Sequence, residues 1–149
     1  MNKFKIHIFI ISIILIPSVA LCFSLTDIFT ANHLDWDFIQ NVGGLEVSDP
    51  EYKLGEGWYL PVKCDVSGLQ FITTKPTALN STLATKGVKA QVKDNKIQIW
   101  VISCLVSKNH PNPVTRGVQL KNIKNGKYQI EYLNKDGTSV LIKEVEFKQ

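Results

Sequence analysis

Histidine is scarce in this sequence, and the motifs of the common catalytic sites are absent. The 149 residues include three histidines, of which only His33 and His110 lie outside the apolar N-terminal segment. There is no Gly-x-Ser-x-Gly motif and no glycine-rich loop that could hold a phosphate group. Asp35 and Asp37 would share a face on a strand, but such a pair is more often a solvated strand edge than an acid–base site. We therefore predict that the protein is not an enzyme, and we keep a hydrolase as the minor hypothesis.

Clustered metal ligands and arginine are also missing. Zinc sites use closely spaced pairs such as Cys-x-x-Cys or His-x-x-x-His, and here the candidates are scattered singly. Met1 is the sole methionine, which removes the usual soft ligands of copper. Arg116 is the only arginine, whereas nucleic-acid and phosphate sites rely on the forked donors of that side chain. We expect no metal, no cofactor and no nucleic-acid partner.

The N-terminal segment has the features of a cleavable secretory signal peptide. Lys3 and Lys5 precede an apolar run over residues 6–16, and no acidic residue occurs before Asp27. The run is about eleven residues long, whereas a helix needs roughly 20 to span a bilayer. A buried N-terminal helix and a short membrane anchor are the alternatives. We predict a signal peptide over residues 1–22, export to the periplasm or out of the cell, and no membrane insertion after cleavage.

Two cleavage positions fit the residues that follow Pro17. Ser18 and Ala20 permit cleavage after Ala20, and Ala20 together with Cys22 permits cleavage after Cys22. Bacterial lipoprotein signals also end in a cysteine, but they need a small residue at the position that Leu21 occupies. We therefore disfavour a lipid anchor at Cys22.

The cysteines provide a check on export. Loss of Cys22 leaves Cys64 and Cys104, an even number that suits an oxidising compartment. A Cys64–Cys104 disulfide would close a loop of about forty residues and stabilise the fold by about 4 kcal/mol in the chain-entropy model. Two independent buried thiols are the alternative, because free cysteine packs as a small apolar residue. We predict the disulfide.

Residues 23–149 are long enough for one domain with a substantial core and too short for two. Loss of the two N-terminal lysines lowers the formal net charge from +4 to about +2, too small to imply a nucleic-acid or membrane-surface partner. Ser24 and Asp27 have the spacing of a helix cap, whereas residues 34–38 alternate between apolar and polar as in a strand. We expect a short helical segment after the signal peptide and then irregular or extended chain up to Gly43.

The remainder of the domain has the pattern of β-strands. Residues 58–66 alternate with the period of a strand, and Pro61 cannot donate a hydrogen bond to a neighbour, so we place this strand at an edge or a bulge. Residues 69–74 are expected to form another strand. Asp94-Asn95 suits a two-residue hairpin turn. The returning strand, residues 96–106, is apolar on both faces and is therefore expected at the centre of a sheet.

The spacing of these segments predicts the fold class. Seven or eight short strands, with turn signals roughly every eight to twelve residues, are typical of antiparallel sandwiches and barrels and not of alternating strands and helices. We predict an all-β fold, specifically an antiparallel β-sandwich over residues 23–149. An immunoglobulin-like fold is one form of such a sandwich, and a barrel is the alternative.

Several side chains are suited to binding another protein. Trp36 lies among acidic residues, Tyr59 lies on the outward face of its strand, and His110 and Asn112 belong to the proline-containing loop 108–113. An exposed aromatic residue can anchor a partner. For any one of these residues taken singly, a structural role alone, as a cap on the core or as part of a connection, is the favoured alternative.

We therefore predict an exported, small protein-binding domain, and the preferred hypothesis is an inhibitor or immunity protein that neutralises a toxic or hydrolytic enzyme. The alternative is a cell-envelope accessory or structural module without catalytic activity, which pairs through a sheet edge.

Overall fold

The computed structural model describes residues 32–106 and 115–148, and these residues are mostly β-strand. The prediction of an all-β fold is confirmed. The expected signal peptide over residues 1–22, the segment 23–31 and the loop 108–113 lie outside the described residues. One short helix, α2 (Trp36–Asn41), occurs in the described part of the chain. None of the helical structure described is long and apolar enough to cross a membrane.

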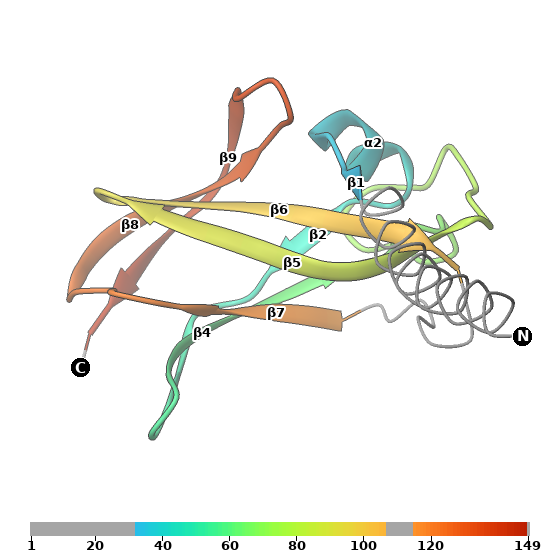
Figure 1. The fold of residues 1–149 in the computed structure, drawn as a ribbon. Helices are drawn as coiled ribbons and strands as arrows, with labels where there is room; N and C mark the ends of the chain where they lie inside the picture. Colours follow the sequence, from blue (N-terminus) through green and yellow to red (C-terminus); the bar gives the residue numbers. More distant parts are fainter. Residues whose placement is uncertain (1–31, 107–114, 149) are drawn as a thin grey trace, which may run out of the picture. The chain divides into compact units, whose positions relative to one another are not determined.

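The larger of two sheets has β6 (Lys96–Leu105) at its centre (Figure 1). On one side β6 pairs with β5 (Leu83–Lys93), and Lys93 opposite Lys96 confirms the hairpin turn at Asp94-Asn95. On its other side β6 pairs with two strands, β1 (Asn32–His33) and β8 (Gly126–Leu133). The sheet continues from β8 to β9 (Ser139–Phe147). The prediction that residues 96–106 form a central strand therefore agrees with the structure.

One strand pair departs from the antiparallel arrangement that we expected. β6 and β8 run parallel, with Ile97 opposite Ile130. The chain that leaves β6 enters the second sheet as β7 (Thr115–Leu120) before it returns to the first sheet as β8. This crossover brings β8 back in the same direction as β6, whereas a direct hairpin connection would have made the pair antiparallel.

The smaller sheet is built around β4 (Gly57–Cys64), which pairs with β7 on one side and with β2 (Leu45–Val47) and β3 (Glu51–Lys53) on the other. The expectation of an edge strand or of a bulge at Pro61 was therefore wrong, because β4 has neighbours on both sides and keeps its register with β7 through Pro61. Pro61 lies opposite Gly117, and its carbonyl accepts a hydrogen bond from the backbone N–H of Ser48. The nitrogen of Pro61, which has no hydrogen to donate, therefore faces the link between β2 and β3. On that side no strand of the described residues pairs with β4 at this point, so no ladder hydrogen bond is lost.

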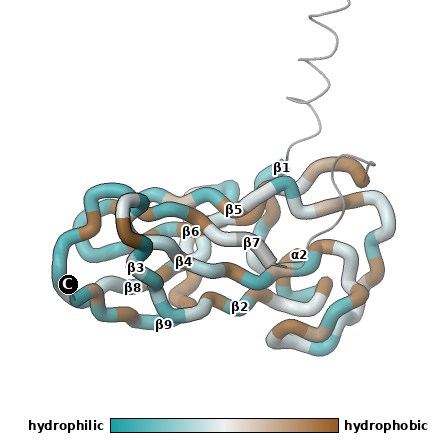
Figure 2. The backbone as a smooth tube through the Cα atoms, turned by 90° about the horizontal axis from the view of Figure 1, so that it is seen from below, coloured by the Kyte–Doolittle hydropathy of each residue, from teal (hydrophilic) through white to brown (hydrophobic). Residues whose placement is uncertain are grey.

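Both sheets contribute to a single apolar core. Leu60 and Val62 of β4 are fully buried, as are Ile97, Ile99 and Val101 of β6. Figure 2 shows hydrophobic and hydrophilic residues interspersed along the strands of both sheets. Four aromatic rings make successive edge contacts from the surface into the core, in the order Tyr52, which is half exposed, Trp58, Phe147 and Tyr128.

Helix α2 replaces the extended chain that we expected over residues 34–38. The backbone N–H of Ile39 donates to the carbonyl of Asp35, and the side chain of Ile39 is fully buried. The hydroxyl of Tyr132 donates to the carbonyl of Leu34 at 2.7 Å and accepts from the N–H of Val101 at 3.3 Å. This hydroxyl ties the segment before the helix to the centre of the larger sheet, which local alternation could not reveal.

Candidate functional site

The chain after β4 forms a loop, residues 65–82, where we had expected a strand at residues 69–74. Asp65 begins the loop with a carboxylate that is only 1% exposed. It accepts hydrogen bonds from the backbone N–H groups of Ser67, Leu69 and Gln70 at 2.9 to 3.1 Å, and from the Ser67 hydroxyl. One buried carboxylate therefore folds the first turn of the loop around itself.

The middle of the loop is held by a single backbone carbonyl. The N–H groups of Ile72, Thr73 and Thr74 all donate to the carbonyl of Gly43, at 3.0, 2.9 and 3.1 Å. The hydroxyl of Thr74 donates to the carbonyl of Gln40, at the last turn of α2. In a strand these N–H groups would donate to a neighbouring strand. Here they donate to the carbonyl of Gly43, just after helix α2, which explains why no strand forms.

The last part of the loop is fixed in the same way. The N–H groups of Thr77 and Ala78 donate to the carbonyl of Asn41, at 2.9 and 3.1 Å. The side-chain oxygen of Asn80 accepts from the N–H groups of Thr82 and Leu83, and the N–H of Asn80 donates to the carbonyl of Ser67. The loop is thus held along its whole length.

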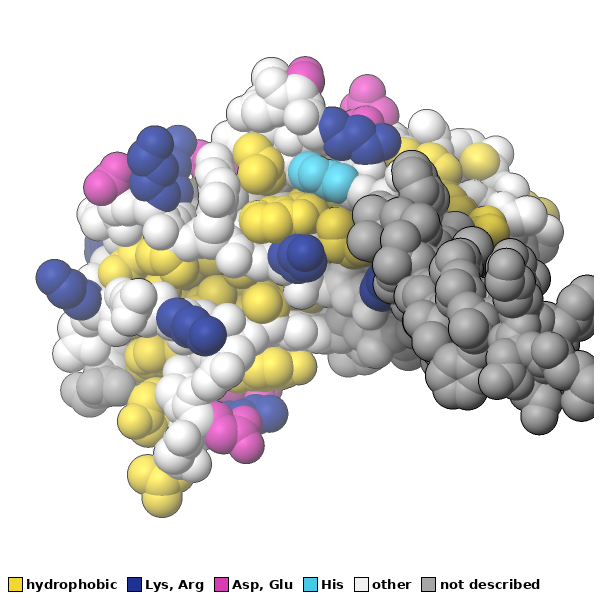
Figure 3. All heavy atoms as spheres, in the orientation of Figure 1, with side chains coloured by type: hydrophobic (Ala, Val, Ile, Leu, Met, Phe, Trp, Pro, Cys, Tyr) yellow, Lys and Arg dark blue, Asp and Glu magenta, His cyan; other side chains and the backbone are white. Residues whose placement is uncertain are grey.

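This anchored loop exposes three large apolar side chains to solvent. Leu69 is 75% exposed, Phe71 is 70% exposed and Leu79 is 77% exposed. We call residues 65–82 with these three side chains the apolar loop. Figure 3 shows apolar side chains at the surface on the side of the molecule that carries this loop in Figure 1. Leu105 and Val106 are also about half exposed, and the N–H of Val106 donates to the carbonyl of Thr82 beside the loop.

The apolar loop has the composition of the centre of a protein interface. Lys75 is the only charged residue among residues 66–82. Depletion of charge with retention of aromatic and aliphatic side chains distinguishes interface centres from ordinary surface. That depletion was the sequence signal that could have revealed the site, and the apparent strand alternation of Leu69 and Phe71 obscured it.

Two of the side chains predicted to bind a partner have structural contacts. Tyr59 lies partly buried on β4, where its hydroxyl occupies the space above Gly117 and the Lys53 ammonium sits 4.1 Å from its ring centre. Trp36 opens helix α2, with its ring 5.3 Å from that of Tyr132. Tyr59 therefore belongs to the smaller sheet and Trp36 packs against the larger one. His110 and Asn112 lie outside the described residues.

The residues of the hydrolase hypothesis also have structural partners. His33 contacts the carbonyl of Leu133 through Nε2 at 2.6 Å, so this nitrogen carries the proton and donates. Asp35 accepts from the N–H of Lys135 at 2.9 Å and lies 3.5 Å from its ammonium group. Among residues 32–106 and 115–148, no three histidine, cysteine or acidic side chains are grouped closely enough to hold a metal ion.

The two cysteines lie on different sheets. Cys64 ends β4 opposite Leu45, and Cys104 lies on β6 opposite Ala84. Both are buried and their thiols are not bonded to each other in this structure. The Cys64–Cys104 disulfide stays a prediction. Burial, and then the neighbouring Asp65 carboxylate, raise the pKa of the Cys64 thiol from 9.0 to about 12.

The raised pKa of Cys64 predicts a stability change at high pH. In the reduced protein the folded state holds the thiol proton more tightly than the unfolded state, so its stabilising contribution is complete below pH 9 and is lost towards pH 12. We expect the free energy of unfolding in urea to fall over this range. The reduced Cys64→Ala variant should show a smaller fall, and an identical fall in both proteins would contradict the assignment.

Comparisons with known proteins assign the chain to no family. No family model matches it, and neither the curated proteins nor the solved structures include a match.

Proposed function

We propose that this chain is an exported, small protein-binding domain that acts as an inhibitor or immunity protein against a toxic or hydrolytic enzyme. The observation that carries the protein-binding part of this proposal is the apolar loop. A partner that covers Leu69, Phe71 and Leu79 removes large apolar area from water without having to order the segment first. Export rests on the N-terminal sequence pattern.

The apolar loop is held firmly by hydrogen bonds, and this supports a role in binding for its exposed apolar side chains. Isolated exposed apolar residues are ordinary on protein surfaces. Here, however, three occur within eleven residues, and eight backbone N–H groups between Ser67 and Ala78 donate to Asp65, Gly43 or Asn41. A partner that packs against a preorganised segment avoids the entropy cost of ordering it on binding.

The double variant Leu69→Ser with Phe71→Ser tests this proposal. The mature protein is used to capture its partner from the cell envelope and culture fluid of its source, and the affinity for the purified partner is then measured. We expect the double variant to lose about 2 kcal/mol of binding, about thirtyfold in Kd. Because both side chains are exposed, its stability in urea should change by less than about 0.5 kcal/mol.

A matched control removes apolar side chains elsewhere. Leu54 is 95% exposed at the β3–β4 turn and Leu141 is 54% exposed on β9. The variant Leu54→Ser with Leu141→Ser should bind the partner as the parent does. Equal loss of affinity in both double variants, or retained affinity in the first, would place the contact outside the apolar loop. A captured enzyme that stays fully active in the complex would contradict the inhibitor part of the proposal.

The envelope accessory or structural module is the second candidate, and β9 is the observation that favours it. Within the described residues β9 pairs only with β8, which leaves its other edge without a strand partner. Lys143 of β9 reaches across to Asp49 at 2.7 Å, a charged contact of the kind that discourages indiscriminate edge pairing. Self-association of the mature chain at micromolar concentration, blocked by a proline in β9, would favour this second function.

We also propose that the two sheets form a β-sandwich, of which the immunoglobulin-like arrangement is one form. The shared core of β4, β6, β8 and β9 side chains supports this description, as does the contact from Lys143 to the Val47 carbonyl at 3.4 Å.

A further inference from the structure

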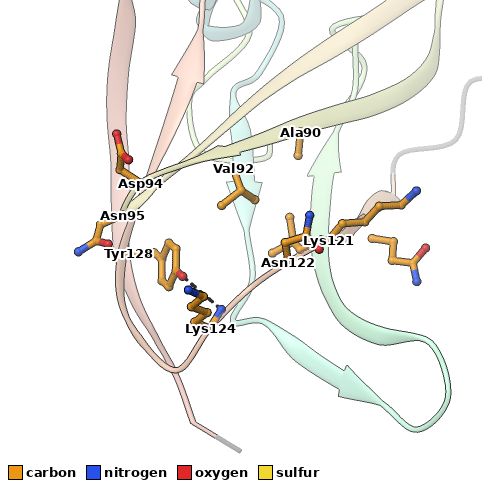
Figure 4. A pocket seen from close by; sticks show the side chains of 10 residues that line it. Ala90, Val92, Asp94, Asn95, Lys121, Asn122, Lys124 and Tyr128 are labelled. Atoms are coloured by element: carbon orange, nitrogen blue, oxygen red, sulfur yellow. Dashed lines mark hydrogen bonds between the residues drawn. The ribbon is translucent and has the colours of Figure 1, made fainter.

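A cavity lies at the end of the domain where β5 turns into β6. Its volume is about 740 Å³. Figure 4 shows Ala90 and Val92 pointing from β5 into this space, with Tyr128 and Lys124 below them and the connection from β7 to β8 at one side. Cavities of roughly 300–1,000 Å³ accommodate small organic ligands. A second cavity of about 630 Å³ adjoins it and shares the Asp94-Asn95 turn and Tyr128.

The walls of this cavity are tied to one another. The N–H of Lys124 donates to the Tyr128 hydroxyl at 3.3 Å, and the N–H of Gln129 donates to the carbonyl of Asn95 at 2.9 Å. The Tyr128 ring is 7% exposed and packs edge-on against Phe147. Asn122 has a φ of +60°, which turns the chain back towards β8 and forms one wall. The cavity is therefore built into the fold and does not depend on a single side-chain rotamer.

The charge around the cavity is mainly positive. Lys121 and Lys124 line the first space, and Lys96 and Lys127 line the second, against the two carboxylates of Asp94 and Glu144. Lys96 is paired with Glu131 at 2.5 Å. None of the ion pairs in the described part of the chain involves Lys121, Lys124 or Lys127.

The neutral part of the lining adds hydrogen-bonding groups and a small apolar surface. Asn122 and Asn95 border this region, and the half-buried side chains of Ala90 and Val92 point into it (Figure 4). Amides and ammonium groups suit a ligand that carries hydroxyls and an anionic group, and the apolar residues suit its carbon skeleton.

We propose that this cavity binds a small organic anion, of the size and chemistry of a phosphorylated or carboxylated sugar. Lys124 holds the anionic group, with Lys121 adding to the positive potential at the rim. Asn122 binds hydroxyls, and Ala90 and Val92 contact the carbon atoms. The site uses none of the apolar-loop residues, so it stands independently of the proposed protein binding.

Titration of the mature protein with three probes, followed by the shifts of its backbone amide resonances, tests this site. The probes are glucose 6-phosphate, glucuronate and glucose, which differ in charge and share one ring. We expect both anions to shift the amides of Val92, Asn95, Asn122 and Lys124 at millimolar concentrations, and glucose to shift them little. The stronger of the two anions identifies the group that the site prefers. Equal shifts with glucose, or shifts confined to other residues, would overturn the proposal.

Two variants separate a site from general attraction to lysines. Lys121→Gln with Lys124→Gln should weaken anion binding about tenfold, whereas Lys75→Gln with Lys89→Gln removes the same charge elsewhere and should have little effect. Ala90→Leu keeps every charge and places a larger side chain where the ligand's carbon atoms would lie, so it should also weaken the shifts. If both double lysine variants weakened anion binding equally, or if Ala90→Leu bound the anions unchanged, the anions would be attracted by surface charge alone. Either result would refute the proposed binding site. The dispersion of the amide spectrum reports whether each variant is folded.

Discussion

Replacement of Asp65 by asparagine is expected to lower the free energy of unfolding by about 3 kcal/mol. The carboxylate is 1% exposed and accepts hydrogen bonds from three backbone N–H groups and one hydroxyl. An asparagine amide keeps one acceptor oxygen and turns two further donors towards groups that already donate. Urea unfolding of the parent and of Asp65→Asn measures the difference.

Asp136→Asn is the matched control for Asp65. Asp136 accepts from the N–H and hydroxyl of Thr138, two residues along the chain, as Asp65 does from Ser67. The hydrogen bonds from Thr138 lower the pKa of Asp136, but this carboxylate is fully exposed. We expect a much smaller loss of stability there, because water replaces the lost contacts. Equal losses in the two variants would show that burial of Asp65 contributes nothing beyond the local turn.

Replacement of Gly43 by alanine is expected to destabilise the protein by at least about 3 kcal/mol. Gly43 has a φ of +121°, and an added Cβ would lie 2.3 Å from the backbone carbonyl oxygen of Gln70. Relief of this contact requires movement of the same segment whose N–H groups bind the Gly43 carbonyl. Thermal or urea unfolding of the variant measures the effect.

Gly55→Ala is the control that measures the cost of the backbone conformation without a steric contact like that between residue 43 and Gln70. Gly55 has a φ of +82°, and nothing lies within 4 Å of a Cβ placed there. We expect a loss of about 1 kcal/mol, due to the backbone conformation alone. If Gly43→Ala lowered the free energy of unfolding no more than Gly55→Ala, residues 70–78 would have to move away from the added Cβ at little cost. That result would contradict the firm anchoring inferred from the hydrogen bonds.

Both large effects also bear on the proposed function. Asp65→Asn and Gly43→Ala leave Leu69, Phe71 and Leu79 chemically unchanged but disturb the groups that hold them. Partner affinity should therefore fall in these variants even where the protein remains folded. Protein binding through a flexible loop would be far less sensitive to either change.

Much of the strand content was predictable because it depends on neighbours along the chain. The alternation over residues 58–66 places Leu60 and Val62 in the core, and Asp94-Asn95 forms the expected two-residue turn. The same reasoning failed at residues 69–74. A backbone N–H can be satisfied by a strand or by any carbonyl that lies within reach, and local alternation does not distinguish the two.

The sites proposed here depend on contacts between distant parts of the chain. The middle of the apolar loop is held by the carbonyl of Gly43, which lies 29 residues before Ile72, the first of its three donors. The cavity forms where the β5–β6 turn meets Asn122 and Tyr128. The surroundings of Trp36 and Tyr59, which the sequence pattern singled out, also depend on distant residues, because Tyr132 and Gly117 come to lie beside them in the fold.

The sequence by itself determined the all-β class, the hairpin at Asp94-Asn95 and the central position of residues 96–106. Each depends on side-chain period or on turn residues that act over a few positions. Only the tertiary structure decided the parallel pairing of β6 with β8, the place of Pro61 inside a sheet and the exposure of the apolar loop. These features arise because hydrogen-bond donors and apolar surfaces are satisfied by whichever distant segment the folded chain brings to them.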